Sequence, residues 1–166
     1  MPKTTKFLAR AAACLSLLMH LPAGHAYLIG EGDRGTVQIG PYVYHFVDNT
    51  DHNQWPRLFG LEYESGSHWL VGGVVFRNSY YQDAAYIYGG KRWFVDAPDN
   101  HIYLKLTAGP VYGYKPPYDD KLPINHDGFG FGVAPALGYQ FKRASVQLVA
   151  PGFSVIAITF GYDLWN

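Results

Sequence analysis

The chain has 166 residues with thirteen basic and thirteen acidic side chains, and this balance excludes the strongly basic surface that nucleic-acid binding requires. Its single cysteine, Cys14, excludes an intramolecular disulfide framework and a cysteine-rich metal site. Aromatic residues make up 17% of the chain, which also holds 19 glycines and few charges, a composition unusual for a soluble domain.

Residues 1–26 predict a secretory signal peptide. Three basic residues precede an apolar run at 11–21, and Pro22–Ala26 follows it. The run is shorter than the about 20 apolar residues that a membrane helix needs, and Ala26 suits signal peptidase, so we expect the mature domain to span 27–166. A lipoprotein anchor at Cys14 is an alternative, but almost no apolar run precedes that cysteine.

After the signal peptide, the chain breaks into eight runs of alternating residues with no helical periodicity. They are Val37–Val47, Leu58–Glu64, His68–Arg77, Ala84–Phe94, Ile102–Val111, Gly130–Tyr139, Ala144–Ala150 and Val155–Leu164. Most have the length of about 9–11 residues that a tilted strand needs to cross a bilayer. The pattern predicts an all-β fold, an eight-stranded antiparallel transmembrane β-barrel.

Two runs alternate most clearly. One face of the fifth carries Ile102, Leu104, Leu106 and Ala108, and one face of the last carries Ile156, Ile158, Phe160, Tyr162 and Leu164. An apolar outer face with a mixed inner face is typical of a membrane barrel, and we expect Tyr86, Tyr88 and Trp93 to plug the interior. A polar pair inside, between Lys105 and Asp163, is also expected. A soluble barrel or sandwich is an alternative, but it would have to cover all these apolar faces.

The connections between runs differ in length. Glu64–His68 and Ala97–Asn100 predict short periplasmic turns, and Asp48–Arg57, Asn78–Asp83 and Gly113–Phe129 predict longer outer loops. His45 ends the first run, and Asn78 and Ser79 follow the third. These three side chains are therefore expected at the same, outer end of the barrel.

Short motifs recur in order along the runs: Tyr44-His45, Phe76-Arg77-Asn78-Ser79, Tyr88-Gly89-Gly90, Leu106–Gly109, Pro135–Tyr139 and Pro151-Gly152. In this order and spacing they resemble the lipid A palmitoyltransferase (PagP) family, eight-stranded outer-membrane enzymes that move an acyl chain from a phospholipid to lipopolysaccharide. The resemblance covers most of the barrel. It implies a cofactor-free acyltransferase in the outer membrane of a Gram-negative bacterium, with phospholipid and lipid A as partners, and we expect a monomer.

The resemblance also implies a catalytic group of His45, Asn78 and Ser79. The family has an aspartate where this chain has Asn78. An amide cannot take a proton, although it can orient an imidazole as in Cys-His-Asn sites. The role of general base therefore falls to His45.

Three further residues carry implied roles. Gly90 corresponds to the floor of the family's acyl pocket, where a missing side chain leaves room for the end of the chain. Pro135 and Pro151 resemble prolines that open a lateral route for lipid, and proline does remove a donor from the strand ladder. The family's amphipathic helix before the barrel has no counterpart, because Tyr27–Thr36 is short and rich in glycine.

Plainer interpretations stay open. His45 is then an interface histidine, Ser79 a turn serine and Gly90 a relief of crowding, and the barrel is structural or transports a small solute such as glycerol phosphate. An eight-stranded barrel argues against a pore, because side chains fill its interior. The dispersed histidines have no metal-ligand spacing, so no metal site is predicted.

Overall fold

The computed structural model describes residues 30–46, 52–95, 101–122 and 124–165. The predicted signal peptide and Cys14 lie outside these residues, as does the predicted turn Ala97–Asn100. Gly32–Asn166 forms one compact unit built from strands. Among the described residues, no helix is long and apolar enough to cross a membrane.

Nine strands lie within this part of the chain. They are β1 Arg34–His45, β2 Leu58–Glu64, β3 Trp69–Arg77, β4 Asp83–Phe94, β5 Ile102–Tyr112, β6 Asn125–His126, β7 Phe129–Phe141, β8 Ala144–Gly152 and β9 Val155–Trp165. The eight predicted strands are confirmed. The two-residue β6 and the 3-10 turn η2, Asp119–Lys121, were not predicted; both belong to the long connection after β5.

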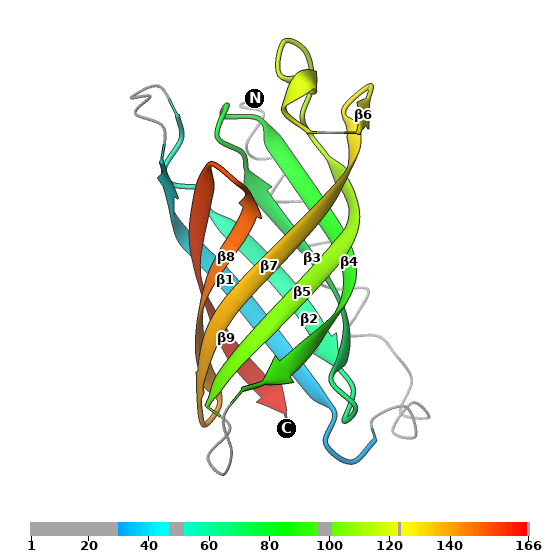
Figure 1. The fold of residues 1–166 in the computed structure, drawn as a ribbon, viewed down its shortest axis with the longest axis vertical. Coiled ribbons are helices and arrows are strands. Elements are labelled where there is room, and N and C mark those ends of the chain that lie inside the picture. Colours follow the sequence, from blue (N-terminus) through cyan, green and yellow to red (C-terminus); the bar gives the residue numbers. More distant parts are fainter. Residues whose placement is uncertain (1–29, 47–51, 96–100, 123, 166) are drawn as a thin grey trace, which may run out of the picture. The chain divides into compact units, whose positions relative to one another are not determined.

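The strands close on themselves. Each pairs antiparallel with its neighbours, β1 pairs with β9, and β5 pairs with β7 while β6 adds a short flap to β7. Closure leaves no free edge, which is how a sheet satisfies its backbone within lipid. Figure 1 shows the tilted strands and the long connections gathered at one end. We call this the loop end, where β1, β3, β5 and β8 finish, and the opposite one the turn end.

The faces of the strands fall as the alternation predicted. In β5, Leu104 and Leu106 face outward while Tyr103, Lys105 and Thr107 are buried inside. The outward face of the barrel carries exposed large apolar residues on every long strand, including Ile39, Phe59, Val71, Ile87, Leu104, Val133, Leu148 and Phe160. Each Å² of apolar surface left in water costs about 25 cal/mol, so this belt belongs in a bilayer and the barrel is transmembrane.

The interior near the turn end is filled by charged side chains. Glu62 lies 3.0 Å from the Lys105 ammonium and 3.3 Å from the Arg92 guanidinium, and Arg92 lies 3.0 Å from Glu64. All four side chains are almost completely buried. We call them the ion-pair cluster. Opposite charges and hydrogen bonds compensate the burial of each member.

Two expectations about the interior need correction. Lys105 pairs with Glu62 rather than with Asp163, whose carboxylate accepts a hydrogen bond from Thr36 and lies 3.5 Å from the Arg34 guanidinium. Trp93 faces outward and is 45% exposed, so it does not plug the barrel. Successive side chains of a strand point to opposite faces. Because Arg92 points inward, Trp93 must point outward.

Candidate functional site

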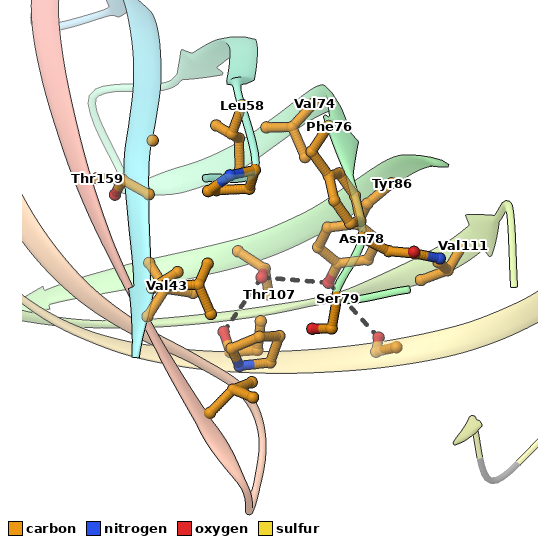
Figure 2. A pocket seen from close by; sticks show the side chains of 18 of the residues that line it. Val43, Leu58, Val74, Phe76, Asn78, Ser79, Tyr86, Thr107, Val111 and Thr159 are labelled. Carbon is orange, nitrogen blue, oxygen red and sulfur yellow. Dashed lines mark hydrogen bonds between the residues drawn. The ribbon is translucent and has the colours of Figure 1, made fainter. Parts of the chain in front are cut away.

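A cavity occupies the loop end of the barrel, above the ion-pair cluster. Its upper wall is apolar and includes Val43, Leu58, Val74, Phe76, Val111 and Ala157. Figure 2 shows Val43, Leu58, Val74, Phe76 and Val111 of this wall together with Asn78 and Ser79. The space, counted with its open mouth, is about 1130 Å³. Such a lining favours an apolar chain over a hydrated solute.

The floor of the cavity is polar. The Tyr88 hydroxyl donates to Glu62 at 2.9 Å and accepts from the Gln38 amide at 3.3 Å, so the ring is held across the barrel. Gly72 makes room for it, because a Cβ on Gly72 would stand 2.6 Å from the Tyr88 ring. Tyr88 and Lys105, a member of the ion-pair cluster, thus belong to the polar floor of the cavity.

Gly90 does not line this cavity. It lies two residues after Tyr88, on the same inward face of β4 and nearer the turn end. Here β5 comes so close that a Cβ on Gly90 would overlap the backbone carbonyl oxygen of Leu106. The expectation that Gly90 forms the pocket floor is therefore not supported, and its missing side chain serves strand packing.

His45 and Ser79 meet at the loop end. His45 Nε2 lies 2.8 Å from Ser79 Oγ, although β2 separates their strands. His45 ends β1 and Ser79 lies in the connection after β3, so the expectation that both stand at one end is confirmed. This is the distance at which an imidazole can accept a proton from a hydroxyl.

Asn78 has a different part in the site. Its side-chain oxygen accepts from the backbone N–H groups of Tyr80 at 2.9 Å and Gln82 at 3.0 Å, and its amide nitrogen donates to the Gly113 carbonyl at 3.4 Å. The residue is 2% exposed. Among the described residues it makes no hydrogen bond to His45, so the expected orienting role is not supported by its contacts. The amide instead folds the connection that carries Ser79.

The connections after β3 and after β5 are joined to each other. The Gln82 side chain accepts from the Lys115 N–H at 3.0 Å and donates to the Lys115 carbonyl at 3.1 Å. The rings of Tyr80 and Tyr118 stack with centroids 4.0 Å apart. Burial, with a smaller effect of Tyr80, raises the pKa of Tyr114 to about 12, so its hydroxyl stays neutral beside the cavity.

Two residues near the site were not singled out as functional from the sequence. The His52 ring lies 4.8 Å from the His45 ring, and Asn53 is bonded to the connection that carries Ser79. An adjacent His-Asn in a polar loop has no periodicity or motif that could have distinguished it.

The hydrogen-bonded pairing between β7 and β8 covers only part of the two strands. Their ladder runs from Phe141↔Ala144 to Ala136↔Val149 and stops there, next to Pro135. Pro151 lies within the register shift between β8 and β9. Val133, Val149 and Pro151 all line the cavity, and Val133 is also exposed on the outer face. Residues of this seam therefore line the cavity, at the place where the resemblance implied lateral access.

The described residues contain no group of three or more histidine, cysteine, aspartate or glutamate side chains that could hold a metal ion. The polar residues that line the cavity near its mouth include Asn53, Arg77, Asn78, Ser79 and Tyr114, and the His45 imidazole contacts Ser79. Their chemistry is proton transfer and hydrogen bonding.

Among the comparisons with known proteins, only the one with solved structures found similar chains. No protein-family model and no curated protein matches the chain. A de novo designed transmembrane β-barrel is similar with a TM-score of 0.46 and 14% identity, over 79% of this chain and 95% of the designed one. The outer membrane protein Ail of Yersinia pestis is similar with a TM-score of 0.43 and 16% identity, over 79% of this chain and 99% of Ail. The closed barrel itself is established by the strand pairing.

Proposed function

We propose that the protein is an outer-membrane acyltransferase that moves a palmitoyl-type acyl chain from a phospholipid to lipid A or a related acceptor. Phospholipid hydrolysis is its side reaction when water replaces the acceptor. The observation that carries this proposal is the 2.8 Å contact between His45 Nε2 and Ser79 Oγ beside an apolar cavity. A base next to a hydroxyl supports acyl transfer, and the apolar walls support a bound hydrocarbon chain.

The chemistry needs only groups that these residues and the lipids supply. Neutral His45 accepts the Ser79 proton through Nε2 as Oγ bonds to the ester carbonyl carbon of the phospholipid. The ester C–O bond then breaks, and the departing lysophospholipid oxygen takes the proton from His45. The acceptor hydroxyl next gives its proton to His45 as its oxygen bonds to the carbonyl carbon of the acyl group on Ser79. The bond between this carbon and Ser79 Oγ then breaks, and Oγ takes the proton back from His45. One ester replaces another, so no cofactor or nucleotide energy is required.

The seam between β7 and β8 supports entry of the phospholipid from the membrane. Pro135 and Pro151 have no N–H to donate, and the ladder ends beside Pro135. An acyl chain passing between the strands would reach the cavity without crossing the polar connections at the loop end. The predicted signal peptide and the apolar belt support the outer membrane of a Gram-negative bacterium as the location, with a monomer as the working unit.

A non-enzymatic barrel is the second candidate. The observation that favours it is that the buried Nδ1 of His45 has no hydrogen-bond partner among the described residues. None of these residues therefore orients the imidazole through Nδ1, as the third member of a complete triad does. A structural barrel could keep the same contact as an ordinary hydrogen bond. Transport of a solute such as glycerol phosphate would in addition need an open lumen.

Mass spectrometry of lipid A separates the two candidates. Cells with the gene should contain lipid A with one additional acyl chain, and cells that carry the Ser79→Ala gene should not. Purified protein should release lysophospholipid from labelled phosphatidylcholine in detergent. Unchanged lipid A together with no lysophospholipid release would reject the enzyme and leave the structural barrel.

A further inference from the structure

Asn53 holds three consecutive backbone carbonyls of the connection that carries Ser79. Its N–H donates to the Ser79 carbonyl at 2.8 Å, and its side-chain amide donates to the carbonyls of Arg77 and Asn78 at 3.2 Å each. The residue is 6% exposed. All three contacts are hydrogen bonds between uncharged amide groups, so they act by fixing the backbone conformation of the connection.

The same segment is also attached to the side that carries His45. The Val43 N–H, two residues before His45, donates to the Gln54 carbonyl at 2.9 Å. The His52 ring packs 4.8 Å from the His45 ring. Asn53 stands between these two attachments. The segment 52–54 therefore bridges the end of β1 and the connection after β3.

Both polar atoms of the Asn53 side chain make hydrogen bonds within the protein. Its oxygen accepts from the Trp55 N–H at 3.1 Å, and its amide nitrogen is shared between two carbonyls. These contacts fit a residue that positions the connection, although Asn53 also borders the cavity.

We propose that Asn53 is a positioning residue that sets the separation between His45 Nε2 and Ser79 Oγ. This inference rests on the proposed acyl transfer. A reacting pair must be held close to its working geometry, and a misplacement of about 1 Å can lower turnover about 100-fold. Loss of the two amide donors removes the hydrogen bonds to the Arg77 and Asn78 carbonyls, and it leaves the Asn53 N–H bond to Ser79 and both reacting side chains in place.

The test compares Asn53→Ala and Asn53→Asp with the wild type. The aspartate keeps the acceptor for Trp55 but presents an oxygen to the two carbonyls, so it removes the donors with little change of shape. We expect both variants to lower kcat by about 10- to 100-fold and to leave KM for phosphatidylcholine in mixed micelles unchanged. The ¹⁵N shift of His45 Nε2 should move toward that of an imidazole without the Ser79 hydrogen bond.

Asn125→Ala is the matched control. The Asn125 amide likewise donates to two backbone carbonyls, those of Tyr114 and Asp119 at 2.8 Å each, in a connection of the same end. It should change neither kcat nor the His45 shift. If the Asn53 variants fold, run as heat-modifiable barrels and keep both wild-type values, the inference is wrong.

A failure of the proposed function gives a different result. If the wild type has no acyl transfer, the His45 shift still reports whether Asn53 sets the contact with Ser79. A shift change in Asn53→Asp but not in Asn125→Ala would then support the geometric claim for a non-enzymatic barrel. If Asn53→Ala does not fold, Asn53→Asp decides alone, and wild-type kcat in that variant overturns the inference.

Discussion

The contact between His45 and Ser79 joins residues 34 positions apart. The sequence could predict their common end, because the first and third strands of an up-and-down barrel run in the same direction. It could not predict the contact, which depends on how two polar connections fold. Asn53 and Asn78 direct that folding through hydrogen bonds to the backbone. Backbone partners of an amide leave no pattern in the sequence.

Replacing Asn78 with aspartate should lower both stability and turnover, although aspartate is the residue that the resemblance implies at this position. The new carboxylate would face the Gly113 carbonyl and the Gln82 side-chain oxygen, to which the amide now donates at 3.4 and 3.5 Å. A buried polar group left without its partners costs about 1–3 kcal/mol. We expect a lower urea midpoint and lower turnover for Asn78→Asp. Turnover above that of the wild type would show that the carboxylate acts on His45 after all.

The strands were the most predictable elements, because a period of two identifies both a strand and its lipid-facing side. The depth of the cavity was not predictable in this way. It depends on which inward side chain folds across the barrel, and the Tyr88 ring does so over Gly72. The alternation places Gly90 on the inner face as well, but it cannot show that Tyr88 and Lys105 line the cavity while Gly90 does not.

A larger side chain on the cavity wall should shorten the preferred acyl chain. Ala134 is buried and lines the cavity, so Ala134→Leu would displace methylenes that each contribute about 0.8 kcal/mol when buried. We expect the preference to shift to a shorter chain by several carbons in a competition assay with phosphatidylcholines of different lengths.

Ala136→Leu is the control for this change. Ala136 is also buried and points inward from the same strand, but it does not line the cavity. Overpacking there costs about 1–3 kcal/mol of stability without touching a bound chain. An unchanged chain-length profile in Ala134→Leu, or an equal shift in both variants, would show that this cavity does not hold the acyl chain.

The barrel as a whole combines an apolar outer belt with two different interiors. The half near the turn end is filled by the ion-pair cluster, and the half near the loop end holds the apolar cavity. The composition of the chain predicted the belt and the closed barrel. It could not predict the division, because the residues of the cluster come from β2, β4 and β5, whose side chains meet inside the barrel only after folding.

The ion-pair cluster should make a large contribution to stability. Glu62→Ala removes the carboxylate that faces both Arg92 and Lys105, and breaking a buried pair costs about 3–5 kcal/mol because a charge is left uncompensated. We expect a clearly lower urea midpoint for this variant in detergent. Asp120→Ala, which removes the exposed pair with Lys121, should leave the midpoint nearly unchanged. Equal midpoints in the two variants would contradict a stabilising cluster.

The same cluster should block conduction. Side chains that are buried and paired across the lumen leave no continuous water path, so we expect no steady channels from the wild type in planar bilayers. Steady channels that pass glycerol phosphate would contradict the filled interior and favour a transporter.

Turnover of the His45→Ala and Ser79→Ala variants tests the acyltransferase account most directly. Purified folded barrels, checked by their heat-modifiable mobility on gels, are assayed for acyl release from labelled phosphatidylcholine. We expect each variant to lose at least about 100-fold in kcat, as is typical when a general base or its partner is removed. The controls are His126→Ala, whose side chain is exposed, and Ser65→Ala, whose half-buried side chain bonds to Ser67 in the turn after β2, and both should keep wild-type turnover. Wild-type rates in His45→Ala and Ser79→Ala would contradict the account.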